Sequence, residues 1–397
     1  MRKDAPGVCI IVENMSVPFD SRAWQEACAL RDAGFQVAVI CPKGHGAQAS
    51  RETLREIEIY RHRSWTGRGR LGYLVEYSAS LTAEFYLALK AYSHHRFQIV
   101  EACNPPDITF LVALVFKPFG VRFVYDHHDL SPELYAVKFN ARGLIYRGMR
   151  FAERLAFRCA DLSLATNESY REIAITRGGM SPERVFVVQT CADLREMNSD
   201  RPDSRIKGNL RNMVLYVGMM ESQDGVNLLI ESIEHLVKQK GRTDTRFVLI
   251  GDGTETPKLK AMVAQKGLQK FIEFTGELPH SEVGHYLSAA DVCVAPDPQN
   301  ELNDRCTMIK NLEYMAYARP VVLFDLMEGR RTLGDGALYA RPNDPVDFAN
   351  RIEKLLESES LRKILGDRNR KRVEEGLNWQ VQSEILTKAF KSLLRTN

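Results

Sequence analysis

The sequence predicts an α/β protein built from two doubly wound parallel sheets. Short runs of β-branched residues alternate with longer helical patterns through most of the chain, which is typical of parallel βαβ units. The 397 residues also exceed the roughly 250–300 that one hydrophobic core usually organises. A similar sequence motif also occurs twice: CADLSLATN begins at Cys159, and AADVCVAPD begins at Ala289. Each is expected to be the end of a helix that leads into a strand. We therefore expect two similar halves rather than one large sheet.

The first half, expected at residues 1–200, carries seven of these strands. They are expected at 8–12, 37–41, 57–61, 98–102, 121–125, 162–165 and 185–188. Between the first two strands the pattern predicts a helix that begins at Ser21 and ends at Gly34. The half ends in a polar stretch at 197–212 that contains Pro, Gly, Asn and Asp without an apolar period, so this stretch is the predicted linker.

The second half, expected at residues 201–377, contains six further strands and five helices. The strands are expected at 213–217, 246–250, 271–274, 291–295, 320–324 and 337–340, and the helices near 226–240, 255–267, 281–289, 308–318 and 345–357. A last amphipathic pattern begins at Asn378 and predicts a C-terminal helix over 378–397.

Composition and charge exclude several classes of protein. The 54 basic and 51 acidic residues leave a net charge of +3, which does not suggest a protein that coats nucleic acid. The eight cysteines form no CxxC pair and no Cys/His cluster at zinc spacing, so we expect them to be reduced. After the first expected strand, the longest apolar run spans residues 108–116, which is shorter than the about 20 residues of a membrane-spanning helix. No signal peptide is visible. A cytoplasmic protein is therefore expected.

The most informative stretch is 300–320, where an acidic polar loop leads into a helix. A helix start offers unpaired N–H groups and the positive end of the dipole, so a diphosphate fits there, and Lys310 adds charge. Glu313 is expected on the same helix face, where its carboxylate could accept hydrogen bonds from ribose hydroxyls. From the helix pattern alone, a capped surface helix with an ordinary Lys–Glu pair explains these residues equally well. No GxGxxG follows the first strand and no GxxxxGK[ST] occurs, which argues against a hydride-transfer enzyme or a P-loop ATPase.

Several motifs, in order along nearly the whole chain, resemble those of the GT-B nucleotide-sugar glycosyltransferases of family four. They are YDHHDLSPELY (125–135), LYVG (215–218), LIGDG (249–253), EFTGELPHSEVGHYLSAADVCVAP (273–296) and EYMAYARPVV (313–322). The nearest match is the bacterial group that builds surface polysaccharides and lipid-linked glycans. The resemblance implies two Rossmann-like domains that face a cleft. It also implies transfer of a sugar from a nucleotide-diphosphate sugar to a glycan, lipid-linked or small-molecule acceptor, with retention of configuration.

The resemblance assigns the donor mainly to the second half and the acceptor to the first. The implied donor-binding residues are Gly218, Gly251, Asp252, Arg305, Thr307, Met308, Ile309, Lys310 and Glu313. The implied catalytic residues are His128, Lys310 and Glu313, and Asn104, Asp126 and Asp129 are expected on the acceptor side. Glu313 would hold the ribose, Lys310 would stabilise charge on the diphosphate, and His128 would orient or polarise the sugar. The C-terminal helix is implied to cross back onto the first half.

The sequence departs from the family pattern in two regions. Arg305 stands eight positions before Glu313, where the family has the first Glu of its Glu-x7-Glu motif. The Arg and Lys that usually follow the glycine at Gly218 are missing, and Glu221 lies close by instead. Phosphate charge would therefore rest on Lys310, Arg305 and the helix start.

Alternatives stay open at this stage. The residues alone explain His128 as a histidine satisfied by backbone at a strand end, and the GDG at 251–253 as a turn. The DHHD at 126–129 could suggest a metal site, but no second ligand group with matching spacing appears. We expect no essential metal and no cofactor besides the sugar-nucleotide co-substrate. A nucleotide-sugar 2-epimerase and a catalytically idle binding protein are the two rival functions.

The segment 134–160 predicts a basic amphipathic helix. Its six basic residues and one acidic residue are Lys138, Arg142, Arg147, Arg150, Arg154, Arg158 and Glu153. Apolar residues accompany them, so this helix could rest on anionic lipid head groups at the inner membrane face and present a lipid-linked acceptor. A solvated helix face, packed by its apolar side, is the equally good alternative.

Overall fold

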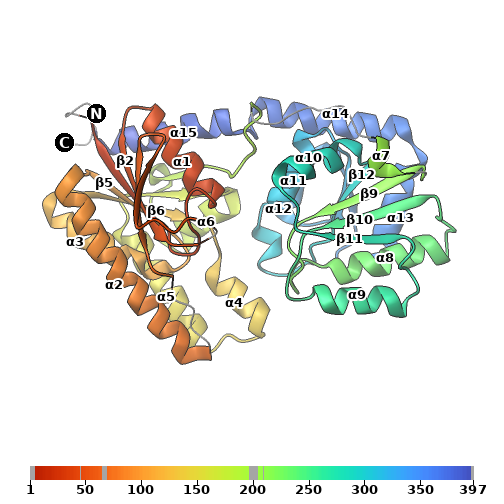
Figure 1. Ribbon diagram of the computed structural model, residues 1–397, viewed down its shortest axis with the longest axis horizontal. Helices are drawn as coiled ribbons and strands as arrows, with labels where there is room; N and C mark the ends of the chain where they lie inside the picture. Colours follow the sequence, from red (N-terminus) through yellow and green to blue (C-terminus); the bar gives the residue numbers. More distant parts are fainter. Residues whose placement is uncertain (1–4, 45, 65–68, 196–203, 209, 395–397) are drawn as a thin grey trace. The chain divides into compact units, whose positions relative to one another are not determined.

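The computed structural model describes residues 5–44, 46–64, 69–195, 204–208 and 210–394 (Figure 1). The chain forms two compact units: the first contains Met1–Thr190 and Gln382–Asn397, and the second contains Cys191–Val381. The predicted boundary at residue 200 falls outside the described residues, whereas the units divide at Thr190. The C-terminal helix α15 (Trp379–Leu394) begins in the second unit and belongs to the first from Gln382 onward.

The first unit is built around an eight-stranded sheet with the order β3-β4-β2-β1-β5-β6-β7-β8. Its strands are β1 (Gly7–Ile11), β2 (Gln36–Pro42), β3 (Arg51–Leu54), β4 (Ile57–His62), β5 (Ile99–Cys103), β6 (Arg122–His127), β7 (Leu162–Ala165) and β8 (Val185–Val187). The seven predicted strands are confirmed with small shifts at their ends, and they pair in parallel. The antiparallel edge strand β3 was not predicted, because its residues alternate between exposed and half-buried and form no apolar run.

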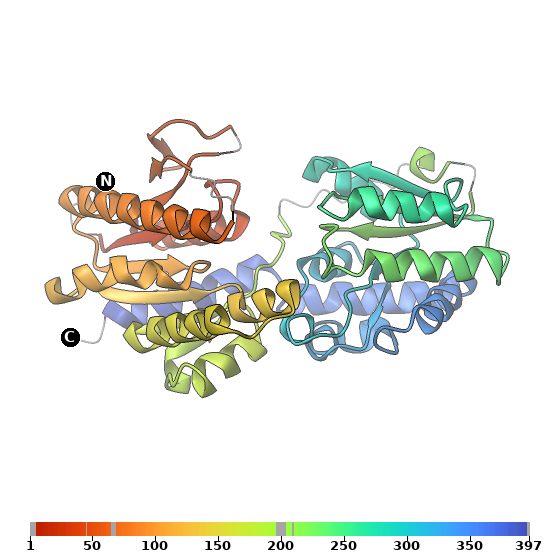
Figure 2. The same ribbon diagram turned by 90° about the horizontal axis from the view of Figure 1, so that it is seen from below.

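Helices lie on both faces of this sheet (Figure 2). They include α1 (Ser21–Asp32), α2 (Gly69–His95), α3 (Phe110–Phe116), α4 (Ser131–Phe139), α5 (Leu144–Cys159) and α6 (Glu168–Thr176). Helix α1 is capped by the carboxylate of Asp20, which accepts a hydrogen bond from the N–H of Ala23 at 3.0 Å. The single basic helix predicted over 134–160 is wrong: Asn140 ends α4 in the left-handed conformation, and α5 begins after Gly143.

The second unit contains a six-stranded parallel sheet with the order β11-β10-β9-β12-β13-β14. Its strands are β9 (Asn212–Val217), β10 (Thr245–Ile250), β11 (Ile272–Gly276), β12 (Val292–Ala295), β13 (Val321–Phe324) and β14 (Ala337–Ala340). The helices include α7 (Ser204–Lys207), α8 (Val226–Lys238), α9 (Thr256–Gln265), α10 (His280–Ala289), α11 (Ile309–Ala316), α12 (Met327–Leu333), α13 (Pro345–Glu357) and α14 (Glu359–Glu375). The predicted six strands and five helices are confirmed.

In the described part of the predicted linker at 197–212, residues 204–207 form α7 and β9 begins at Asn212. Two further helices, α12 and α14, were not predicted. Helix α14 is strongly charged and buries only Leu365, Gly366, Asn369 and Val373, so its apolar period is weak. Among the described residues, no helix combines the length and the apolarity that a membrane crossing requires.

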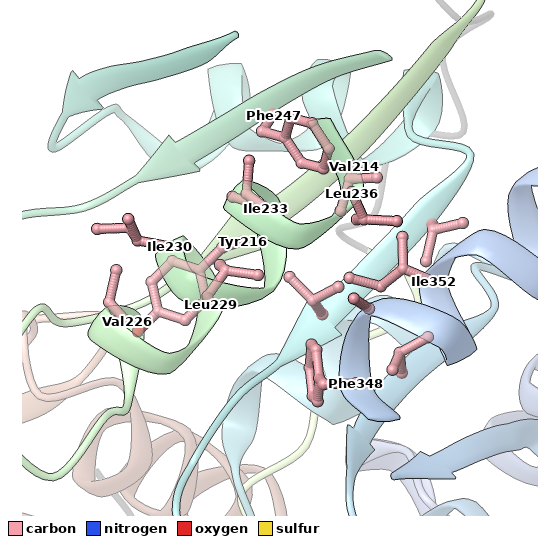
Figure 3. Close-up of a cluster of buried hydrophobic side chains, with 14 of the residues drawn as sticks. Val214, Tyr216, Val226, Leu229, Ile230, Ile233, Leu236, Phe247, Phe348 and Ile352 are labelled. Carbon is pink, nitrogen blue, oxygen red and sulfur yellow. The ribbon is translucent and has the colours of Figure 1, made fainter. Parts of the chain in front are cut away.

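The core of the second unit positions the loops that follow its strands. Val226, Leu229 and Ile230 of α8 pack with Tyr216 of β9 in one buried cluster (Figure 3). Burying each such apolar side chain contributes about 1.5–3 kcal/mol relative to leaving it exposed. Because α8 begins directly after the loop that follows β9, this packing holds the loop at the carboxyl edge of the sheet. Ligands of open α/β sheets bind at that edge.

Candidate functional site

In the second unit, the loops after β9 and β10 approach each other at two glycines. Gly218 and Gly251 have positive φ angles of 155° and 125°. A Cβ at Gly251 would lie 1.9 Å from the carbonyl oxygen of Gly218, so no side chain fits between the two loops. The structure therefore brings together these two residues, which are predicted to bind the sugar-nucleotide donor. Because both are glycines, no side chain of theirs covers the backbone.

Lys310 lies beside this pair of glycines, in the first turn of α11. Its ammonium is 2.8 Å from Oδ1 of Asp297 and 4.9 Å from the ring centre of Tyr216. A Cβ at Gly218 would lie 3.5 Å from Cε of Lys310. Burial by itself would lower the pKa of Lys310, but the charge of Asp297, aided by Tyr216 and Asp224, raises it above its ordinary value. Lys310 is therefore a buried lysine whose charged form is stabilised by Asp297.

Helix α11 is tied directly to the strand that leads to Gly218. The hydroxyl of Tyr314 accepts a hydrogen bond from the N–H of Val217 at 2.8 Å. At the other end of the helix, Met308 is the N-cap and offers no side-chain acceptor to the first N–H groups, while Ile309 is exposed. Thr307 and Arg305 precede this start and are half-buried, Arg305 in a short 3-10 turn. The predicted helix start is thus present beside the glycines.

Glu313 lies one turn after Lys310 and is half-buried. Burial raises the pKa of its carboxyl group, and the nearby His280 opposes this shift. The ordinary Lys–Glu pair that the pattern allowed does not explain Lys310, whose ion-pair partner is Asp297. Glu313 and Lys310 are therefore two separate groups on the same helix.

The acidic residues near the glycines organise the loops. The carboxylate of Glu221 accepts hydrogen bonds from the N–H and the hydroxyl of Thr254, at 2.8 and 2.6 Å. Asp252 is exposed and accepts from the N–H of Gly253 at 2.8 Å. The nearby Thr256 side chain, followed by the N–H of Gly253, lowers the pKa of Asp252. These contacts fit the turn explanation of the GDG sequence, and the role of Asp252 at a nucleotide stays a prediction.

Several residues of this region escaped the sequence analysis. Asp297 lies two residues after the end of β12 and is buried, and Asn311 lies next to Lys310 in α11. One side-chain oxygen of each lacks a hydrogen-bond partner among the described residues. Both line a cavity of about 10 Å³ together with Asn303, whose amide donates to the carbonyl groups of Gln223 and Pro298 at 2.9 Å. The position of Asp297 at a strand end was the signal that could have identified it.

In the first unit, the structure brings together the predicted residues that follow β5 and β6. The N–H groups of His128 and Asp129 both donate to Oδ1 of Asn104, at 2.6 and 3.0 Å. The amide of Asn104 donates in return to the carbonyl oxygen of Asp129 at 2.7 Å. Nε2 of His128 bonds to the carboxylate of Asp126. The explanation that backbone groups alone satisfy this histidine is therefore wrong.

Asp126 is fully buried and is held by an arginine that the sequence analysis missed. Nε and Nη2 of Arg22 lie 3.2 and 2.8 Å from its two carboxylate oxygens. Burial would raise the pKa of Asp126, but Arg22 and His128 hold it well below its usual range. Asp126 is thus an ionised group that orients His128, and its burial leaves no surface for an acceptor. Burial raises the pKa of Asp129 instead.

Two groups of side chains among the described residues have the spacing of metal ligands. One contains Glu26, Cys103, Asp126 and His128. The guanidinium of Arg22 already compensates Asp126 there, so a second cation would meet strong repulsion. The other group contains Glu13, His62 and Glu84, and it shares no residue with the first.

Two Rossmann-like units, each with its polar loops at the carboxyl ends of parallel strands, define a GT-B protein. The solved structure of sucrose-phosphate synthase from Thermosynechococcus elongatus has this fold and matches the chain with a TM-score of 0.79 at 18% identity, over 99% of this chain and 100% of that one. The structure of Anabaena HepE in complex with UDP-glucose matches with a TM-score of 0.71 at 15% identity, over 97% and 99%. The predicted fold class is confirmed.

The chain belongs to the GT-B glycosyltransferases of the family-four type. Residues 20–191 match the family described as glycosyl transferase 4-like domain, and residues 211–358 match glycosyl transferases group 1. α-D-Kanosaminyltransferase of Streptomyces kanamyceticus is 28% identical over 226 residues, which is 55% of this chain and 57% of that protein. The chain spans about half the length of the curated relatives it matches.

Proposed function

We propose that this protein transfers a sugar from a nucleotide-diphosphate sugar to a glycan, lipid-linked or small-molecule acceptor, with retention of configuration. The observation that carries the proposal is the buried, charged Lys310 at the start of α11, beside the backbone of Gly218 and Gly251. The complex of HepE with UDP-glucose supports a nucleotide-sugar donor for this fold.

The diphosphate is proposed to bind at the start of α11. An ammonium group has three N–H donors, and Asp297 engages one of them, so others are available to phosphate oxygens. The open N–H groups at the helix start and the backbone at Gly218 add partial positive charge. These donors stabilise the charge that develops on the leaving diphosphate. The carboxylate of Glu313 binds the donor ribose, and Arg305 adds charge near the phosphates.

Retention on one face of the sugar lets the departing diphosphate help to remove the acceptor proton. A strong side-chain base is therefore not required, and His128 has an orienting or polarising role. Because Nε2 of His128 faces Asp126, Nδ1 is the nitrogen that remains for a sugar hydroxyl. Asp126 acts through His128 and is a positioning residue, whereas Asn104 shapes the loop that carries it.

The acceptor side of the proposal includes an anionic membrane surface. Phe139, Leu144 and Phe151 of α4 and α5 are 59%, 84% and 63% exposed. Five arginines of the segment 134–160 accompany these apolar side chains. An apolar surface with basic residues around it adsorbs to anionic lipid, with about 1 kcal/mol from each basic residue near the membrane. A lipid-linked acceptor at the cytoplasmic membrane face fits such a surface.

Nucleotide binding is the first test. The purified chain is heated with UDP, GDP, dTDP or CMP, and at least one of them should raise its melting temperature, since a ligand that binds only the folded state stabilises it. Hydrolysis of sugars linked to the best nucleotide then identifies the donor. An idle binding protein with a degraded site would respond to none of the four, and that outcome would overturn the proposal.

Incubation with the donor alone separates the second rival. A 2-epimerase would form a new sugar nucleotide without an acceptor, whereas a transferase releases only sugar and nucleoside diphosphate. None of the relatives named above is an epimerase. The contact of Glu221 with Thr254 also removes one reason for expecting an idle site, because this carboxylate is engaged by the loop itself.

A further inference from the structure

Three titratable side chains converge in the first unit at a place that the proposed reaction does not use. Glu13 follows β1, His62 is the last residue of β4, and Glu84 lies in α2. One nitrogen or oxygen atom of each lies within 4.8 Å of the other two. His62 and Glu84 are 6% and 1% exposed. Strands β1 and β4 run parallel to β2, so their carboxyl ends share the edge of the sheet where ligands bind.

The converging atoms lack hydrogen-bond partners among the described residues. They are Oε2 of Glu13, Nε2 of His62 and Oε1 of Glu84. A buried polar atom without a partner is costly, and a buried carboxylate more so. Nε2 of His62 and Oε2 of Glu13 lie 3.3 Å apart, so either a proton or a metal ion held between these side chains would compensate their burial.

The second ring nitrogen of His62 has a backbone partner. Nδ1 of His62 lies 3.1 Å from the carbonyl oxygen of Arg63, which can only accept, so Nδ1 carries a proton. In the neutral imidazole Nε2 then directs its lone pair at the carboxylates, whereas in the imidazolium Nε2 would donate to Glu13. Metal-binding histidines commonly donate their second N–H to a backbone carbonyl in this way. The 3.3 Å between Nε2 of His62 and Oε2 of Glu13 suits two atoms bound to one ion at about 2.1 Å each.

We propose that Glu13, His62 and Glu84 bind one first-row divalent metal ion of the Mn²⁺ or Zn²⁺ class. The imidazole nitrogen favours these ions over Mg²⁺ and Ca²⁺, which prefer oxygen ligands alone. The charge of the ion compensates the two carboxylates. The metal-like group around Asp126 differs in this respect, because Arg22 already supplies its positive charge.

The competing state is a proton held within the group, either shared by the two carboxyl groups or carried by Nε2 of His62 beside Glu13. Without a cation, burial and the charge of Glu13 raise the pKa of Glu84. The guanidinium of the neighbouring Arg61 is engaged elsewhere, by Glu52 and the carbonyl groups of Val17 and Ala49. A bound ion would join the segment after β1 to β4 and α2. That segment leads to α1, whose Arg22 holds Asp126.

Direct metal binding to the full chain tests the site. The protein is treated with EDTA, freed of chelator, and titrated calorimetrically with MnCl₂, ZnCl₂ and MgCl₂ in separate experiments. The wild type should bind one equivalent of Mn²⁺ or Zn²⁺, and more weakly Mg²⁺. Glu84→Gln should weaken binding at least about a hundredfold, since even the loss of an outer-shell partner costs 10–100-fold. His62→Gln should do the same.

His95→Gln is the matched control. Nε2 of His95 also lies close to a carboxylate, at 3.1 Å from Oε2 of Glu58, but Arg51 and Tyr60 already bind that carboxylate. This variant should retain the full equivalent and the affinity of the wild type. The proposal would be overturned if Glu84→Gln bound the metal with wild-type affinity, or if the wild type bound no equivalent of metal. A proton held within the group would then be the explanation.

Thermal melting distinguishes lost binding from lost folding. Glu84→Gln removes one of two like charges, so the metal-free variant should melt at no lower a temperature than the metal-free wild type. The increase in melting temperature that Mn²⁺ or Zn²⁺ causes in the wild type should be absent from this variant. If Glu84→Gln does not fold, Glu13→Gln at the half-buried position gives the same readout. If the metal raises the melting temperature of a folded Glu13→Gln variant as much as that of the wild type, this result would also contradict the site. None of these measurements depends on sugar transfer.

Discussion

The ammonium of Lys310 lies 2.8 Å from Oδ1 of Asp297, and both groups are buried at the carboxyl edge of the second sheet. A lysine that binds phosphate must stay charged before the ligand arrives, and burial opposes this. Asp297 resolves the conflict, because its charge raises the pKa of Lys310 despite the burial. The pair therefore has a structural role besides the binding role proposed for Lys310, and substitutions can separate the two.

Lys310→Met should reduce both stability and transfer. Removing one partner leaves the carboxylate of Asp297 buried without compensation, and breaking a buried pair costs about 3–5 kcal/mol. In the double variant Lys310→Met/Asp297→Asn most of the stability should return, as measured by urea unfolding. Transfer should remain at least about tenfold low in both, which corresponds to about 1.4 kcal/mol of transition-state stabilisation. Transfer that recovers together with stability would show that Lys310 has no role at the phosphates.

Glu313→Ala should lower transfer at least about tenfold, because the carboxylate is proposed to accept from the donor ribose. With the wild type, transfer from a donor that contains 2′-deoxyribose or 3′-deoxyribose should be slower than transfer from the normal donor. With the variant, this difference in transfer rate should be much smaller. Glu282→Ala on the exposed side of α10 is the control and should behave as the wild type. Equal discrimination against both deoxy donors in Glu313→Ala and the wild type would argue against ribose binding by this residue.

Gly251→Ala should abolish nucleotide-induced stabilisation. The new Cβ would lie 1.9 Å from the carbonyl oxygen of Gly218, so the two loops must separate, and the φ of 125° adds strain. Gly241→Ala is the matched control, since Gly241 also has a positive φ but nothing within 4 Å of the added atom. The control should lose only about 1 kcal/mol of stability and keep its response to nucleotide. Melting curves with and without the best nucleotide provide the measurement.

Asp126→Asn should lower stability in a manner that depends on pH. The pKa of Asp126 is lower in the folded protein than in the unfolded chain, so its stabilising effect is present above the unfolded value of about 3.9. This effect is lost as the pH falls through the lowered folded value. The difference in melting temperature between wild type and variant should thus be large at pH 7 and shrink from pH 4 toward pH 2.

The same variant should lower transfer because His128 loses the carboxylate that orients its ring. Asp367→Asn, which removes an exposed carboxylate paired with Lys363, is the control and should change stability by at most about 0.5 kcal/mol at any pH. A difference for Asp126→Asn that stays constant down to pH 2 would contradict the lowered pKa.

Phe151→Ser together with Leu144→Ser should weaken adsorption to vesicles that contain anionic phosphatidylglycerol, by at least about tenfold in cosedimentation. Both side chains are exposed on α5, whose buried residues are Glu153, Ala156 and Phe157. Tyr86→Ser on α2 is the control, because it removes an equally exposed aromatic side chain from another helix. Binding of the wild type should also fall as salt is raised. Equal binding of all three proteins would favour the solvated helix face instead.

Local patterns determined much of what the sequence revealed. Strand patterns alternate with helix patterns along the chain, and this alternation indicates βαβ units because strands and helices differ in their spacing of apolar residues. These patterns identified every parallel strand of both sheets. The edge strand β3 has no such pattern and forms through its pairing with β4. The break between α4 and α5 depends on one left-handed residue, Asn140, inside an otherwise continuous helical pattern.

The sequence by itself determined the two halves, the glycine at the end of β9, the helix start before Lys310 and the His–Asp sequence after β6, because each follows from residues close together in the chain. Only the tertiary structure decided which charges meet. Lys310 pairs with Asp297, Asp126 is held by Arg22, and Glu13 meets His62 and Glu84. Such partners come from different elements, and their distances depend on how whole strands and helices pack. Since burial and charge together fix each pKa, the chemistry of these groups exists only in the folded chain.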